Sequence, residues 1–396
     1  MPIAPQAQRR MWIAYLSGAF GLAATAQINF LVPLRARELG ASFDVIGLLV
    51  GAGAVAPSLL AVASGAAIDR LDPRRTFVIG TAATAALALL FPFATSYWWF
   101  LVLQPLLGIA RNLGWLASQT YITGLGTGQQ QHGIAGRFTF FTSAGQMAAP
   151  ALIGAVAQWV GVRWAFLFLA AYAAAFASLG LLLPRPGWGG SPDPRESHGT
   201  GVRAALQLLA VRAMQVVLLL SGVRLWITWI YTAFMPAYLV DHGLQPATVG
   251  SVLATYGVVA SLIAPSTGWW TQRASGPTVA MIGLGCGIIA LLIAPHFVTV
   301  PLVYLAPALI GVGHGVSLPV LLTIVAGAAP PGKRGVALGL RGAVNQATAA
   351  AGPILVGALI SSAGAPRGFA IGAAVGAAML VAAQRRGSAA SPHAPS

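Results

Sequence analysis

The chain alternates between long apolar stretches and short polar segments. A helix that spans a membrane needs about 20 mostly apolar residues, and twelve stretches of the sequence reach that length. The alternating ten-residue strands typical of an outer-membrane barrel are absent from the pattern. We therefore predict an all-α polytopic membrane protein with twelve transmembrane helices. The predicted spans are 11–34, 45–68, 76–95, 99–122, 139–160, 164–184, 214–239, 247–267, 277–295, 300–327, 336–362 and 367–384.

The composition excludes an ordinary soluble protein. Of the 396 residues, 57% are hydrophobic and 7% are charged, whereas a soluble chain carries about 25% charged residues. The formal net charge is +15, but so few charges do not favour nucleic-acid binding. A basic excess in an apolar chain is typical of loops that face an anionic membrane surface. The single Cys286 excludes a disulfide framework.

The distribution of basic residues predicts the orientation in the membrane. With the N-terminus inside, the cytoplasmic segments hold 16 Arg and Lys residues, Arg341 among them, and the outer loops hold four. Cytoplasmic loops are the ones that carry an excess of Lys and Arg, so both termini are predicted to be cytoplasmic. Arg outnumbers Lys by 21 to one in an Ala- and Gly-rich chain, which suggests a GC-rich bacterial genome and therefore the bacterial inner membrane. The four outer basic residues are Arg35, Arg37, Arg163 and Arg367.

A polar segment near the middle divides the chain into two sets of six helices. Residues 185–213 are rich in Pro, Gly and charged residues, which is typical of a solvated linker. The predicted organisation is an N-terminal six-helix bundle over 1–184, a cytoplasmic linker over 185–213, and a C-terminal six-helix bundle over 214–386. Residues 387–396 are small and polar and are predicted to be a disordered tail.

The two halves repeat each other at one constant offset. Sliding the second half back by 203 residues aligns Pro and Gly positions across six helices without a net gap. Parallel repeats about an axis normal to the membrane are a known transporter plan, with the substrate between the halves. The matched pairs include Pro33 with Pro236, Gly40 with Gly243, Arg70 with Arg273, Gly108 with Gly311, and Gly154 with Gly357.

Three short motifs resemble signatures of the major facilitator superfamily. Residues 65–75 are similar to the family's loop signature, in which a Gly is followed by Asp-Arg and a basic pair. Residues 268–273 resemble the degenerate second-half copy of this loop, and residues 159–166 resemble the link between helices five and six. The resemblance covers essentially the whole chain. It implies two six-helix halves that move by rocker-switch alternating access around a central site lined by helices one, four, seven and ten.

The 65–75 loop supplies the candidate gating residues. Gly65 allows another helix to approach closely, and Asp69 is able to pair with Arg or with a helix N-terminus. Contacts that form in one conformation and break in the other give a gate two states. The alternative is that the basic residues only fix the topology. The candidates are Gly65, Asp69, Arg70, Arg74 and Arg75.

Three basic residues lie deep within predicted spans. Charge in mid-bilayer costs about 2.5–3.5 kcal/mol on insertion scales, so Arg111, Arg224 and His314 are candidates for function. The repeat offset pairs His314 with Arg111. The family resemblance places the three on cavity-lining helices four, seven and ten. The alternative for each is a structural role, in which the side chain binds helix-end carbonyls or forms core hydrogen bonds.

Helical spacing adds aromatic and polar neighbours to these residues. Trp115 shares a face of its helix with Arg111, and Tyr231 shares a face with Arg224. Asn29 and Gln146 are further candidates, although amides also hold helices together. Arginine beside aromatics and hydroxyls suits a carboxylate, phosphate or sulfonate on an organic body. No Asp or Glu lies inside any predicted span.

We therefore predict a secondary transporter for a small organic solute, anionic or amphiphilic in character. We expect small-molecule substrate and lipid bilayer as partners, protons if transport is coupled, with His314 as the candidate carrier, and a monomer. We expect no nucleic-acid partner, cofactor, metal or enzymatic activity, because no nucleophile–base or metal-ligand set is present at a readable spacing. Two alternatives are a proton-coupled multidrug efflux antiporter and a transport-inactive membrane sensor.

Overall fold

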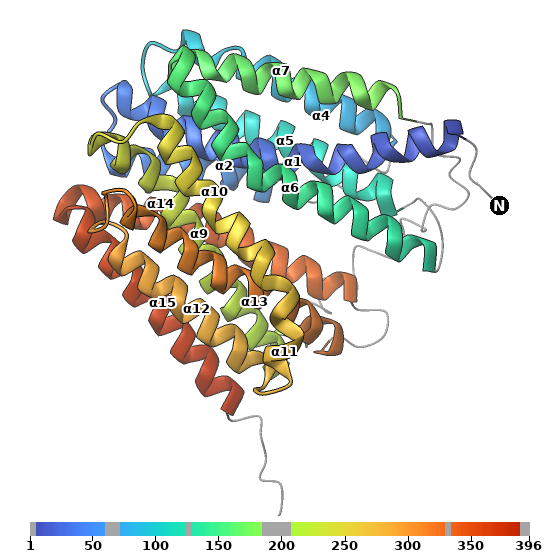
Figure 1. Cartoon of the computed structure of the whole chain (residues 1–396), viewed down its shortest axis with the longest axis vertical. Coiled ribbons are helices and arrows are strands. Elements are labelled where there is room, and N and C mark those ends of the chain that lie inside the picture. The colour runs from blue at the N-terminus through green and yellow to red at the C-terminus, as the bar shows by residue number, and fades with distance from the viewer. Residues whose placement is uncertain (1–4, 60–71, 124–128, 184–206, 329–333, 389–396) are drawn as a thin grey trace, which may run out of the picture. The chain divides into compact units, whose positions relative to one another are not determined.

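A computed structural model describes residues 5–59, 72–123, 129–183, 207–328 and 334–388. Every regular element in these ranges is helical (Figure 1). The elements of the first half are α1 (Pro5–Glu38), α2 (Phe43–Leu59), α4 (Pro73–Ala88), η1 (Phe91–Phe93), α5 (Trp99–Thr123), α6 (Gln129–Val160) and α7 (Val162–Leu181). Those of the second half are α9 (Arg212–Asp241), α10 (Pro246–Ile263), η3 (Ala264–Ser266), α11 (Thr267–Thr271), α12 (Gly276–Ile293), η4 (Leu302–Tyr304), α13 (Leu305–Ala328), α14 (Arg334–Ala363) and α15 (Ala365–Ser388).

These helices confirm the predicted polytopic architecture. Within the described ranges, eleven helical segments are long and apolar enough to cross a membrane. The remaining predicted span, 45–68, corresponds to α2, which is apolar but shorter. The described residues stop where α2 ends. Twelve predicted spans therefore each have a helical counterpart.

The observed helix boundaries differ from the predicted ones at several places, including the following three. Helix α6 begins at Gln129, ten residues before the predicted span, because its first turns are polar and carry no apolar periodicity. The predicted 247–267 span divides into α10, η3 and α11, with a proline in η3. Helix α15 continues to Ser388, so the first two residues of the predicted tail are helical. Most of the predicted linker lies outside the described residues.

The internal repeat is visible in the backbone. Helices α2 and α10, α4 and α12, and α7 and α15 each begin 203 residues apart. Gly40 and Gly243 have φ angles of 85° and 86°, and Gly161 and Gly364 have angles of 83° and 84°. These values lie in the left-handed region, which glycine adopts without a steric cost. The two halves are therefore pseudo-symmetric down to the turns that connect their helices.

The chain forms two compact units that each combine one half with a short segment of the other. Unit 1 comprises Met1–Ser42, Leu48–Ser191 and Leu239–Ala254. Unit 2 comprises Phe43–Gly47, Pro192–Tyr238 and Thr255–Ser396.

Glycines allow the exchanged segments to pack closely within their units. In unit 2, a Cβ at Gly47 would lie 2.1 Å from the carbonyl oxygen of Pro353. In unit 1, a Cβ at the equivalent Gly250 would lie 2.3 Å from the carbonyl oxygen of Pro150. Real Cβ atoms do not approach backbone this closely, so only glycine fits at either helix contact.

Candidate substrate site

Arg224, Thr228 and His314 form one hydrogen-bonded group inside unit 2. Nη2 of Arg224 lies 3.1 Å from Nδ1 of His314, and Oγ1 of Thr228 lies 2.5 Å from Nε2 of the same ring. Because a guanidinium only donates, Nδ1 accepts, and the ring proton on Nε2 is donated to Thr228. Thr228 in turn donates to the carbonyl oxygen of Arg224, 2.9 Å away. The closed ring of bonds holds His314 in a neutral form.

A second basic side chain reaches the same face of α9. Ser221 precedes Arg224 by three residues, so both lie on one face of the helix. Nε of Arg341, two turns into α14, donates to Oγ of Ser221 at 3.1 Å. The positive charge of Arg341 repels that of Arg224. Arg341, predicted to be one of the cytoplasmic charges, is the second residue of the apolar part of α14 and is bonded to α9.

Several polar atoms around this group are buried without a hydrogen-bond partner. Among the described residues, seven side-chain atoms have this character, and four of them belong to α9, α13 and α14. Native proteins rarely leave such groups unpaired, so each calls for an explanation. The four atoms are Nε of Arg224, the hydroxyl oxygen of Tyr231, Oγ of Ser317 and Oδ1 of Asn345.

Among the described residues, neither Arg224 nor Arg341 forms an ion pair with a carboxylate. Asp44, which belongs to unit 2, accepts a hydrogen bond from Oγ of Ser361 instead. The sequence contains no Asp or Glu after Asp241. Asp241 itself lies in unit 1, where its Oδ2 is 2.8 Å from Nε of Arg37. The helices that carry Arg224, His314 and Arg341 thus form a basic site with hydroxyls and one amide. Such a site is suited to bind an anion.

In unit 1, Arg111 has a simpler environment. Its Nη1 donates to Oγ1 of Thr25, which donates to the carbonyl oxygen of Gly21 at 2.7 Å. Trp115 stacks on Phe138 with the ring centroids 6.1 Å apart. A Cβ at Gly21 would lie 2.4 Å from the Trp115 ring. Trp115 therefore fills the contact between α1, α5 and α6.

The two amide candidates take no part in the Arg111 contact. Asn29 on α1 and Gln146 on α6 are both partly buried. Within the described part of unit 1, the hydrogen bond of Arg111 is to Thr25. Of the predicted substrate residues, the structure thus joins Arg224 directly to His314 and leaves Asn29 and Gln146 apart from such a group.

The candidate gating loop is described only at its end. Gly65, Asp69 and Arg70 lie outside the described residues. Asp72, at a φ of 77°, caps α4 by accepting from the backbone N–H of Arg74 at 3.0 Å. The side chain of Arg75 is exposed.

Arg74 binds the end of a neighbouring helix in unit 1. Its Nε donates to the carbonyl oxygen of Gly180 at 3.2 Å, and its Nη2 donates to that of Leu181. The last carbonyls of a helix lack partners within the helix, and the helix dipole favours a cation there. Arg74 thus ties α4 to the C-terminus of α7.

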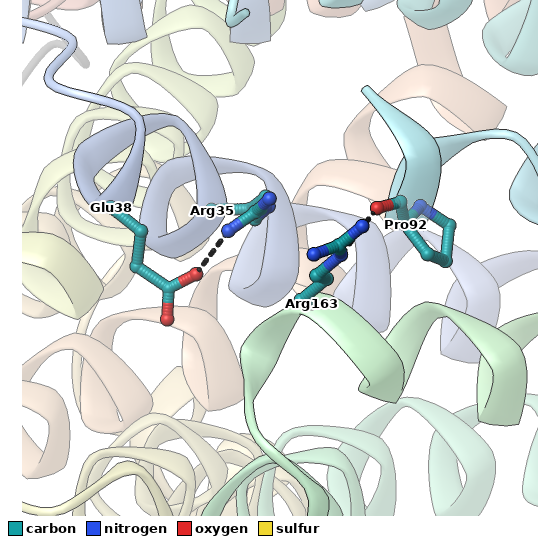
Figure 2. A network of polar contacts seen from close by, with 4 residues as sticks. All are labelled: Arg35, Glu38, Pro92 and Arg163. Atoms are coloured by element: carbon teal, nitrogen blue, oxygen red, sulfur yellow. Dashed lines mark hydrogen bonds and ion pairs between the residues drawn. The ribbon is translucent and has the colours of Figure 1, made fainter. Parts of the chain in front are cut away.

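Two of the basic residues predicted for the outer loops bind groups near the helix ends, although Nε of Arg35, like Nε of Arg224, is buried without a partner. Nη1 of Arg35 lies 2.9 Å from Oε2 of Glu38, and Nε of Arg163 donates to the carbonyl oxygen of Pro92 at 2.6 Å. Figure 2 shows both contacts. The guanidinium of Arg163 also lies 5.0 Å from the ring centroid of Trp164. Arg35 and Arg163 therefore each bind a neighbouring group of the protein. Among the described residues, no group of three His, Cys, Asp or Glu is placed to hold a metal ion.

Comparisons with known proteins agree with this fold. The family model described as Major Facilitator Superfamily matches residues 11–245 and 217–394. No curated protein matches the chain in sequence. The nucleoside transporter NupG matches with a TM-score of 0.81 and 14% identity, over 95% of this chain and 99% of that one.

Two further solved structures give the same result. A bacterial homologue of the human lysosomal transporter Spinster has a TM-score of 0.77 and 14% identity, over 97% of both chains. The human organic anion transporter MFSD10 has a TM-score of 0.64 and 17% identity, over 96% of this chain and 100% of that one. At these identities the likeness concerns the fold alone.

Proposed function

The chain belongs to the major facilitator superfamily, and from that premise we propose that it carries a small organic anion across the membrane by alternating access. Arg224 and His314 in unit 2 would recognise the anionic group. Tyr231, two turns further along the same face of α9, would contact the organic body of the substrate. Arg111 and Trp115 would contribute from unit 1.

One observation carries this proposal. Arg224 is held deep in a spanning helix, its Nε has no described partner, and its bonded neighbour is a neutral imidazole. An arginine at the centre of a membrane helix costs about 2.5–3.5 kcal/mol on insertion scales. A bound carboxylate, phosphate or sulfonate would compensate this cost by a charge-assisted hydrogen bond. A purely structural arginine would be expected to bind helix-end carbonyls, as Arg74 does.

The fold neighbours do not select the substrate. Their names include a nucleoside transporter, a peptide transporter and an organic anion transporter. The preference for an anion therefore rests on the basic group of unit 2. A cationic drug would meet Arg224 without a carboxylate to bind it, so the same group disfavours efflux of cationic drugs.

The membrane setting extends the proposal. The chain is a multi-pass membrane protein, and its charge distribution supports the bacterial inner membrane with both termini in the cytoplasm. We propose that residues 65–75 gate the cytoplasmic side, with Arg74 anchoring the loop to α7. A monomer is sufficient for this scheme.

Binding of matched probes by purified full-length protein tests the anion site. Benzoate and benzamide have the same aromatic body and differ in charge. We expect benzoate, and not benzamide, to raise the midpoint of thermal unfolding. Arg224→Gln should remove the benzoate shift, because the buried guanidinium is lost. The control Arg367→Gln removes an equal charge from an exposed position and should leave the shift intact. Equal shifts with both probes would contradict an anion site.

A further inference from the structure

Arg341 makes a part-buried polar contact that the fold does not require. Its partner Ser221 corresponds, at the 203-residue offset, to Gly18 of unit 1, and Arg341 itself corresponds to Phe138. In unit 1 these two positions meet as an apolar contact, because a Cβ at Gly18 would lie 2.6 Å from the Phe138 ring. The same crossing of helices thus packs well without charge. The arginine in unit 2 needs another explanation.

The position of Arg341 makes its charge costly. It lies two turns into α14, in a helix long and apolar enough to span the membrane, and is partly removed from solvent. It also repels Arg224, and among the described residues neither arginine has an ion pair with a carboxylate. Two like charges in a medium of low dielectric constant interact strongly. A ligand with a single negative charge would neutralise only one of them.

We propose that Arg341 is a second anion-binding residue of the unit 2 site, and that the substrate is an organic dianion such as a phosphate monoester or a dicarboxylate. This inference rests on the proposed function, since it takes Arg224 as the first anion-binding residue. The ligand neutralises both guanidinium groups, with Ser221 holding Arg341 toward the face of α9 that carries Arg224.

Three of the four unpartnered atoms of this region are donors that match an oxygen-rich ligand, and the fourth, Oδ1 of Asn345, is an acceptor. Nε of Arg224 and the hydroxyls of Tyr231 and Ser317 are donors in need of acceptors. They come from α9 and α13, and Arg341 adds donors from α14. A phosphate monoester or a pair of carboxylates offers several acceptor oxygens at once. A monocarboxylate offers two.

The test compares two probes with one aromatic body and different charge. Phenyl phosphate at pH 8 carries two charges, since the second phosphate pKa is about 6, and benzenesulfonate carries one. We expect purified wild-type protein to bind phenyl phosphate about ten- to hundredfold more tightly, as one additional charge-assisted hydrogen bond allows. Arg341→Gln should remove this preference and change the benzenesulfonate affinity by less than about threefold. Arg341→Lys should retain part of the preference, because the charge remains.

A paired variant guards against loss of folding. Ser221→Gly with Arg341→Phe recreates the contact that Gly18 and Phe138 make in unit 1, and it should likewise lose the preference for phenyl phosphate. Equal affinities of the wild type for both probes would overturn the dianion assignment. So would an Arg341→Gln variant that loses both probes alike, since Arg341 would then only position Arg224. If Arg224→Gln binds both probes normally, the proposed function itself fails.

Discussion

The two units use equivalent positions on their first and fourth helices for different chemistry. In unit 1, Arg111 on α5 donates to Thr25 on α1. In unit 2, the equivalent His314 on α13 bonds to the equivalent Thr228 on α9. Both threonine residues are therefore held by a basic side chain from the same neighbouring helix. The repeat has preserved the contact while changing the base.

The units diverge one turn earlier along the same helix. Position 21 in unit 1 is a glycine that packs against Trp115. The equivalent position in unit 2 is Arg224, which bonds to His314. An imidazole accepts a hydrogen bond from a guanidinium, whereas a second guanidinium cannot. Histidine in place of arginine at position 314 of α13 thus supplies an acceptor for Arg224 on α9.

This difference identifies the substitutions that distinguish one half of the repeat from the other. At the positions equivalent to Ser221, Arg224 and Arg341 of unit 2, unit 1 has Gly18, Gly21 and Phe138. The backbone turns are nevertheless alike to within a few degrees of φ. The polar residues of unit 2 are therefore not a requirement of the helix packing, which favours a role in binding.

Exchanging the two basic residues should produce the largest effect. In His314→Arg, Thr228 keeps a donor but Arg224 loses its acceptor and faces another guanidinium. We expect His314→Arg to weaken benzoate binding by about ten- to hundredfold, the range of a lost hydrogen bond to a charged group. Arg111→His keeps a hydrogen-bonding ring beside Thr25 and should change the affinity less. Isothermal titration measures both.

The reverse order would break the comparison. If Arg111→His weakens benzoate binding more than His314→Arg does, unit 1 holds the anion and the group in unit 2 is structural. If both variants weaken it alike, benzoate binding does not distinguish the two units. Thermal unfolding without ligand serves as the control for folding of each variant.

Much of the fold was accessible from the sequence because the membrane restricts the possible elements to helices. Hydropathy alone predicted the spans, and glycine and proline spacing predicted the repeat that the backbone confirms. The boundaries of α6 and α10 were less accessible. Polar first turns and a proline-containing 3-10 segment change the helix without changing the apolar run.

The candidate site was accessible only in part. Burial cost singled out Arg224 and His314, and the structure makes them neighbours. Arg341 was missed because it lies near a predicted helix end, where charge is usually topological. The 203-residue offset held a signal, since it places this arginine opposite Phe138, an apolar position. The side chains that meet between two helices depend on how each helix is rotated about its own axis, and hydropathy does not specify that rotation.

Where the units are alike, substitutions should have equal effects of intermediate size. Gly47→Ala in unit 2 and Gly250→Ala in unit 1 each place a Cβ against a proline carbonyl oxygen, at 2.1 and 2.3 Å. We expect each to destabilise the protein by about 1–3 kcal/mol, the usual cost of overpacking. The midpoint of thermal unfolding in detergent measures this effect.

The matched control for these variants is Gly285→Ala in α12, where no atom lies within 4 Å of an added Cβ. Alanine in an open helical position should stabilise by about 0.5–1 kcal/mol. Unequal losses for the two test variants would show that the exchanged segments do not support their units to the same degree.

The smallest effects should come from the outer ends of the helices. Pro92 and Pro295 are equivalent, yet Arg163 donates to the first carbonyl and Tyr238 donates to the second, at 2.6 and 3.0 Å. We expect Arg163→Met and Tyr238→Phe each to cost about 1 kcal/mol, the value of one hydrogen bond. Glu38→Gln, which breaks the exposed pair with Arg35 (Figure 2), should cost less than about 0.5 kcal/mol. A larger loss for Glu38→Gln than for Arg163→Met, in thermal unfolding, would mean that the ion pair rather than the proline carbonyl secures this end of unit 1. The two units would then differ at their outer ends as well as at the crossing of their first and fourth helices.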